Sequence, residues 1–85
     1  MSAVTAQVSL YPLRQTSIEP AVSEAVRIFS ERGLRARIGA MSTLVWGEEQ
    51  VLFAALQEAF HSATERGDTV MVVTLSNACP SPEER

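Results

Sequence analysis

Apolar and polar residues alternate at the start of the chain. Between residues 3 and 10 an apolar side chain returns at every second position, which is the period of a strand with one face in the core. The positions expected to point inward are Val4, Ala6, Val8 and Leu10. Pro12 is expected to end this strand, because proline has no N–H to donate to a sheet ladder.

A helical period follows this strand. Apolar residues three and four positions apart form one stripe, which consists of Ile18, Val22, Ala25, Val26 and Phe29. Either Thr16, paired with Glu19 in a capping box, or Ser17 is expected to cap this helix. Pro20 suits the first turn, where its missing N–H costs nothing. Gly33 is expected to end the helix, because glycine adopts the left-handed conformation without a steric penalty.

A second helix is predicted after Glu48 and Glu49, since the helix dipole favours acidic residues at this end. Its apolar stripe is wider and consists of Val51, Leu52, Ala55, Leu56, Ala59, Phe60 and Ala63. Gly67 is expected to end it. The two helical segments are related, since EAVRIFSERG at 24–33 and EAFHSATERG at 58–67 share their first two and last three residues. This similarity suggests a duplicated β-α-β unit.

Three more strands complete the pattern. Residues 34–40 place Arg35 and Arg37 on one face, which suits the edge of a sheet, where charge discourages pairing with other chains. Residues 41–46 predict a third and more apolar strand. Residues 69–75 predict a fourth strand that is apolar on both faces. Gly39 or the residues just after it are expected to make the tight turn between the first two of these strands.

The order β-α-β-β-α-β predicts an α+β, ferredoxin-like sandwich formed by a single domain (residues 1–81) with a frayed tail (residues 82–85). Right-handed crossovers place both helices on one face of a four-stranded antiparallel sheet. The other face would then be bare, although the fourth strand is apolar there. Exposed apolar surface of this kind marks an interface, so we expect a homodimer or tetramer. A monomer with a weakly apolar open face is the alternative.

Composition excludes several classes of partner. The formal net charge is -3 and the basic residues do not cluster, so we expect no nucleic-acid partner. No apolar run approaches the roughly 20 residues that span a bilayer, so we expect no membrane insertion. The N-terminus lacks the basic and apolar regions of a signal peptide, which makes a cytoplasmic location the expectation.

The sequence lacks the residues that the common catalytic and metal-binding sites of this fold need. The loop at 11–17 has no cysteine for a metal carrier, and Cys79, the single cysteine, cannot hold an iron–sulfur cluster. No glycine-rich phosphate loop is present. His61 lies beside the second apolar stripe without an orienting partner, so we expect it to be a solvated surface residue. We therefore expect no enzyme activity, no catalytic residue, no metal and no cofactor.

Several short motifs, taken together, resemble the YkoF-like family. They occur in the right order over nearly the whole chain, and they are Ser9-Leu10-Tyr11-Pro12, Glu24-Ala25-Val26, Ser42-Thr43-Leu44, Val51-Leu52-Phe53 and Leu75-Ser76-Asn77-Ala78-Cys79-Pro80-Ser81. The resemblance implies binding of thiamine or its hydroxymethylpyrimidine moiety, linked to uptake of these compounds. The type protein of that family carries two such repeats in one chain and this chain carries one, so a homodimer would imitate the tandem.

An aminopyrimidine site needs a flat apolar slot with a few fixed donors and acceptors. Polar residues where the strands of the expected order 4-1-3-2 end are the candidates, and they are Tyr11, Ser42, Thr43, Ser76 and Asn77. Turn capping and cross-strand hydrogen bonding are their alternative roles. Trp46 could face the thiazolium cation, or it could be a core or interface residue. Glu48 or Glu49 could add charge and Arg14 could hold a phosphate, although helix starts and loops favour such residues anyway.

The leading hypothesis is a non-enzymatic protein that binds thiamine or hydroxymethylpyrimidine and supports vitamin uptake or homeostasis. The alternative is a structural or regulatory interaction module that acts through its apolar sheet face. That module would show no response to small ligands. A small ferredoxin-like enzyme such as an acyl phosphatase ranks last, because that chemistry needs a water-orienting Asn on the third strand, and residues 41–46 contain none.

Overall fold

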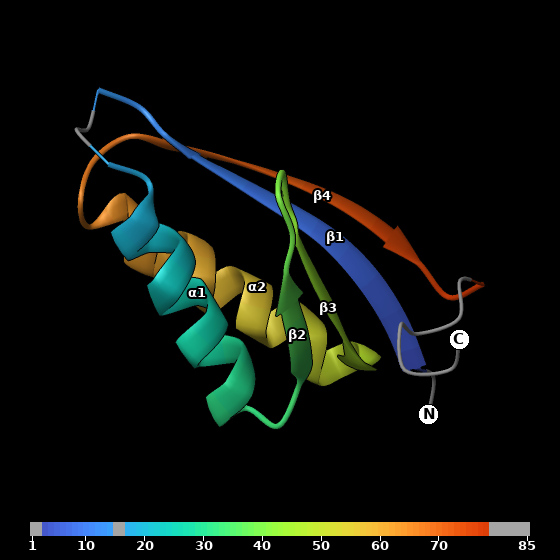
Figure 1. The fold of residues 1–85 in the computed structure, drawn as a ribbon. Coiled ribbons are helices and arrows are strands. Elements are labelled where there is room, and N and C mark those ends of the chain that lie inside the picture. The colour runs from blue at the N-terminus through green and yellow to red at the C-terminus, as the bar shows by residue number, and fades with distance from the viewer. Residues whose placement is uncertain (1–2, 15–16, 79–85) are drawn as a thin grey trace.

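A computed structural model describes residues 3–14 and 17–78 of the chain. The elements, in chain order, are β1 (Ala3–Pro12), α1 (Glu19–Glu31), β2 (Arg35–Ile38), β3 (Thr43–Glu48), α2 (Glu49–Thr64) and β4 (Thr69–Ser76). This is the predicted βαββαβ order (Figure 1). The predicted cap at Thr16, the cysteine at position 79 and the tail 82–85 lie outside the described residues.

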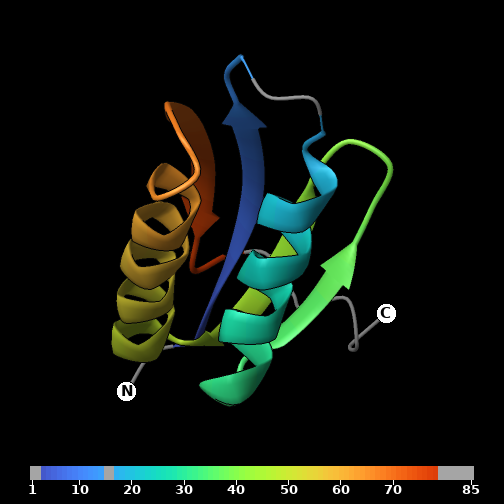
Figure 2. The ribbon, with the colours of Figure 1, turned by 90° about the vertical axis from the view of Figure 1, so that its left-hand side faces the viewer.

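The four strands form one antiparallel sheet in the order β2-β3-β1-β4, which confirms the predicted strand order. Both helices lie side by side on one face of this sheet (Figures 1 and 2). The fold is therefore the predicted α+β, ferredoxin-like sandwich. The described helices include none that is long and apolar enough to cross a membrane.

The core lies between the sheet and the two helices. All four positions of β1 that were predicted to point inward are buried. The largest fully buried side chains come from both helices and from β3, and they are Phe29, Ile28, Leu52 and Val45. Gly33 has a φ of +81° directly after the first helix, as predicted for a residue that ends a helix in the left-handed region.

The predicted apolar stripe of α1 is partly wrong. Ala21 and Ile28 are buried in this helix, whereas Ile18 is 56% exposed. The helix packs against α2 as well as against the sheet, so its buried face includes residues on the α2 side of the predicted stripe. Ile18 precedes the first turn and is itself the N-cap. The predicted cap at Ser17 is also wrong, because its hydroxyl accepts only from the Glu19 N–H and does not cap the helix.

The connection between β2 and β3 shortens the second predicted strand and moves the start of the third from residue 41 to residue 43. The Gly39 N–H donates to the Ser42 carbonyl at 2.8 Å, which closes a turn over residues 39–42. Ser42 was predicted to lie on the third strand and instead lies in this turn, since β3 begins at Thr43. At the far end of β3, Glu48 caps α2 by accepting a hydrogen bond from the Val51 N–H at 3.0 Å.

Strand β4 leaves much of its apolar surface exposed on both faces. Val70 and Val72 point away from the helices, and their exposed fractions are 44% and 50%. Val73 and Leu75 lie on the helix side and are also exposed. The strand is at the edge of the sheet, and α2 covers only part of it. The predicted apolar strand with an open face is thus present in the structure.

Candidate functional site

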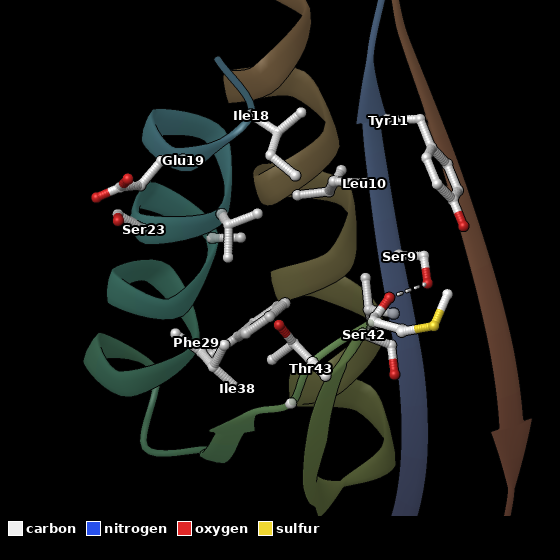
Figure 3. A pocket seen from close by; sticks show the side chains of 16 residues that line it. Ser9, Leu10, Tyr11, Ile18, Glu19, Ser23, Phe29, Ile38, Ser42 and Thr43 are labelled. Atoms are coloured by element: carbon white, nitrogen blue, oxygen red, sulfur yellow. Dashed lines mark hydrogen bonds between the residues drawn. The ribbon is translucent and has the colours of Figure 1, made fainter.

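The sheet has a gap beside the C-terminal third of β1. Strand β3 pairs with β1 only as far as the cross-strand pair of Val8 and Thr43, whereas β4 pairs with β1 as far as Pro12. Among the described strands, residues 9–12 therefore have a neighbour on the β4 side only. A pocket of about 420 Å³ opens at this place, between β1, the N-terminal half of α1 and the 39–42 turn (Figure 3).

The walls of this pocket are mostly apolar. Phe29 is fully buried, and its ring lies beside the pocket from the α1 side (Figure 3). Leu10 lines the β1 side, and Figure 3 shows its side chain pointing toward α1. Ile18 and Ile38 line the pocket and remain exposed, which places them at its mouth. An apolar slot open at one end fits a flat ring with a polar substituent that stays in water.

Thr43 is the buried polar residue of this pocket. Only 8% of its surface is exposed, and Figure 3 shows its hydroxyl pointing into the space between α1 and β1. Within residues 3–14 and 17–78 this hydroxyl has no hydrogen-bond partner. A buried hydroxyl without a partner costs about 1–3 kcal/mol, so such groups are uncommon unless a ligand or water satisfies them.

The structure divides the six predicted site residues into two groups. Tyr11, Ser42 and Thr43 line the pocket. Trp46 and Ser76 flank Thr5 at the opposite end of the sheet, and Asn77 follows directly after Ser76. Thr5 and Tyr11 are six residues apart on β1, or about 20 Å at the rise of a strand. The predicted single cluster at the strand ends is therefore wrong, because antiparallel strands end at opposite edges of a sheet.

Comparisons with known proteins decide the family. A sequence model of the thiamine-binding protein family matches residues 6–76, which is most of the chain. The chain belongs to the thiamine-binding protein family. This confirms the relationship that the sequence motifs indicated. No curated protein matches the sequence of this family member.

Solved structures share the fold of this thiamine-binding family member at low sequence identity. A hypothetical protein of Methanocaldococcus jannascii is 24% identical with a TM-score of 0.83. The match covers 95% of this chain and 86% of the Methanocaldococcus jannascii chain. A candidate thiamine biosynthesis/salvage protein of Thermotoga maritima is 17% identical with a TM-score of 0.79. The match covers 96% of this chain and 92% of the Thermotoga maritima chain. A Streptococcus pneumoniae protein is 20% identical with a TM-score of 0.81. The match covers 99% of this chain and 96% of the Streptococcus pneumoniae chain.

Other polar residues that the sequence singled out have structural partners in this family member. The Ser76 hydroxyl accepts from the Ala78 N–H at 2.9 Å, which is the turn-capping alternative. Arg14 forms an ion pair with Asp68 outside the pocket. Glu48 caps α2, as described above. His61 is exposed on α2, in agreement with the predicted surface role. These contacts account for Ser76, Arg14 and Glu48 without a ligand.

Charge is sparse at the pocket. Glu19 lines the rim, and Figure 3 shows its carboxylate pointing away from the interior.

Shifted pKa values occur at Glu24 and Arg27, which are not among the residues that line the pocket. The Arg27 hydrogen bond lowers the pKa of Glu24, and the Glu24 and Glu31 carboxylates raise the pKa of Arg27. The described residues contain no group of three acidic, His or Cys side chains that could hold a metal.

Sequence reasoning missed the apolar part of this site. Phe29 was assigned to a core stripe and Ile38 to one face of a strand, and both line the pocket. A signal was present at Ile18, a large apolar residue that directly follows the polar run 14–17. The position of Leu10 beside the pocket carried no signal, because a sequence pattern does not show where a neighbouring strand stops.

Proposed function

We propose that the pocket between β1, α1 and the 39–42 turn binds thiamine or its hydroxymethylpyrimidine moiety without catalysing a reaction. Membership of the thiamine-binding protein family supports the class of ligand. The observation that carries the location is the buried, unpartnered hydroxyl of Thr43 in an apolar pocket. Binding of this kind would serve uptake or homeostasis of the vitamin.

The dimensions and lining of the pocket support this ligand. A volume of about 420 Å³ falls within the roughly 300–1,000 Å³ typical of small-molecule sites. Phe29 and Leu10 provide apolar contact for a methylpyrimidine ring, and Thr43 provides one group that can both donate and accept. The open mouth leaves room for the cationic thiazolium to remain hydrated, with Glu19 at the rim.

A non-enzymatic role is supported by the residues at the pocket. General acid–base catalysis needs a titratable side chain within hydrogen-bond reach of the reacting atoms. Among the described lining residues, the titratable side chains are Tyr11 and Glu19. Figure 3 shows both pointing away from the interior, Tyr11 across β1 and Glu19 away from α1. Binding is therefore the function that this lining suits best.

Titration calorimetry and thermal unfolding with thiamine, hydroxymethylpyrimidine and thiamine phosphates test the proposal. Ligand at about 100 times its dissociation constant adds roughly 2.7 kcal/mol to the free energy of unfolding. In a domain of this size, each kcal/mol raises the midpoint temperature by about 4–8 °C. We expect a saturable rise with the pyrimidine compounds. The absence of any rise at millimolar concentrations would contradict the proposal.

A pair of matched variants locates the site. Thr43→Val removes the buried hydroxyl, and we expect it to weaken binding roughly tenfold, the value of one hydrogen bond. Thr74→Val makes the same change on the outer face of β4, outside the pocket, and should leave the affinity unchanged. Equal affinities of the two variants and the wild type would place the ligand elsewhere.

We also propose that a second copy of the chain covers the exposed apolar residues of β4. Val70, Val72 and Tyr11 are neighbours on the outer face of the sheet, and each is exposed by 44–50%. An exposed apolar sheet face favours packing against the same face of an identical chain, because the same residues complement each other across a two-fold axis. A module that binds a different protein through these residues is the second candidate, and it predicts a monomer in isolation.

A further inference from the structure

The main-chain hydrogen bonds of β1 alternate between its two neighbours. The Leu13 N–H donates to the Asp68 carbonyl at 2.8 Å, directly beyond the last register pair of β1 and β4. In antiparallel pairs every second residue exchanges hydrogen bonds with the same neighbour. The register runs without interruption, so the N–H and C=O of Tyr11 point to β4. Those of Leu10 point to the opposite side, toward β3.

Within the described part of the chain, no strand lies on that side of Leu10. The pairing of β3 with β1 ends at Val8 and Thr43. Residues 39–42 leave the sheet in their own turn, and no main-chain hydrogen bond joins that turn to Leu10 among residues 3–14 and 17–78. The Leu10 N–H and C=O therefore face the pocket as an adjacent donor and acceptor without a protein partner in the described structure.

These two groups share the site with the Thr43 hydroxyl. Leu10 is 8% exposed, so its main chain has little contact with bulk water. Thr43 is paired with Val8, and Leu10 is the diagonal neighbour, at roughly 7–8 Å between Cα atoms. Unpaired main-chain groups at a buried position are rare and costly. The pocket thus holds a donor, an acceptor and a hydroxyl, all unsatisfied and all within the reach of one heterocycle.

We infer that the Leu10 main chain selects a 4-aminopyrimidine over a 4-oxopyrimidine. This inference rests on the proposed function. The amino group of the ring donates to the Leu10 carbonyl, and the adjacent ring nitrogen accepts from the Leu10 N–H, as a strand would pair with its neighbour. Thr43 supplies a further hydrogen bond at the ring edge. A paired donor and acceptor on one planar edge is also how amide side chains read adenine.

Thiamine analogues separate this recognition from simple occupancy. Oxythiamine differs from thiamine in carrying a 4-oxo group, so its ring presents an acceptor and an N–H in inverted order. Both pairs with Leu10 would then be mismatched, and each mismatch costs about tenfold in affinity, or roughly 100-fold together. Pyrithiamine keeps the aminopyrimidine and replaces the thiazolium with another cationic ring. It is the matched control and should bind like thiamine.

The Leu10 amide proton gives an independent readout on the wild-type protein. Ala6 and Val8 point to the same side of β1 and pair with β3, so their amide protons are the internal references. In the free protein we expect the Leu10 amide proton to exchange with solvent at least roughly tenfold faster than those of Ala6 and Val8. Saturation with thiamine should remove this difference.

The outcomes are distinct. Tight binding of thiamine and pyrithiamine, weak binding of oxythiamine and protection of the Leu10 amide would support the inference. Equal affinities for thiamine and oxythiamine, or an unchanged Leu10 amide in the thiamine complex, would overturn it and leave the proposed binding function standing. If none of the three compounds binds at millimolar concentration, the proposed function fails and this inference fails with it.

Discussion

Val8 and Thr43 form the last cross-strand pair between β1 and β3, and beyond them β1 continues with a neighbour on its β4 side alone. The difference in length between the two strands creates the pocket. It also leaves the Thr43 hydroxyl at the floor of an opening rather than under a complete sheet. The groups proposed to form hydrogen bonds with the ligand lie at this pair, in Thr43, or two residues beyond it along β1, in Leu10.

Replacing Thr43 with valine should not destabilise the ligand-free protein. The change exchanges a buried, unpartnered hydroxyl for a methyl group of similar size, which removes a desolvation penalty of about 1 kcal/mol. We expect the free energy of unfolding, measured by urea denaturation, to stay the same or to rise by about that amount. A loss of more than about 1 kcal/mol would mean that the hydroxyl has a partner in the free protein.

Replacing Asn77 with alanine tests whether the ligand binds in the pocket or at the other end of the sheet, where Ser76 and Asn77 lie. The sequence motifs predict that this residue contacts the ligand, so that Asn77→Ala would weaken binding. The structure places Asn77 directly after Ser76, at the end of the sheet away from the pocket. We expect Asn77→Ala to leave the dissociation constant for thiamine within about twofold, as calorimetry would measure it. A tenfold loss would move the site to that end of the sheet.

Replacing Gly47 with alanine should destabilise the fold. A Cβ atom at position 47 would lie 2.4 Å from Cδ2 of Leu34, which is itself buried in the core. Overpacking of this kind costs about 1–3 kcal/mol, and chemical denaturation would measure it. In the Gly47→Ala/Leu34→Ala double variant the clash is gone. The cost of Gly47→Ala should then be smaller in the Leu34→Ala background than in the wild type.

Replacing Val72 with lysine tests self-association. The side chain is 50% exposed on the outer face of β4, so a charge there should change the stability of an isolated chain by less than about 0.5 kcal/mol. In a dimer that buries this face, the charge would be desolvated. We expect sedimentation velocity to show a dimer or tetramer for the wild type and a monomer for Val72→Lys. Gln57→Lys, on the exposed surface of α2, is the control and should remain associated. A monomeric wild type at high micromolar concentration would contradict the proposal.

The elements of the fold could be predicted because they depend on local periodicity. The two-residue alternation of β1 identified its buried face, and Gly33 marked the end of α1 through its own backbone preference. The errors occurred where packing decides. Ile18 belongs to the apolar period of α1 and yet lies at the mouth of a pocket, because the helix begins one residue later.

The sequence by itself determined the order of the elements, the ferredoxin-like sandwich and the family of the protein. These follow from the spacing of apolar residues, turn residues and short motifs, which are local properties of the chain. It also predicted Thr43 as a site residue, and the structure places Thr43 in the pocket lining. Only the tertiary structure decided that Thr43 and Ser76 lie at opposite ends of the sheet and that Leu10 faces a gap. The register and the lengths of neighbouring strands settle both points, and they result from packing between segments far apart in the chain.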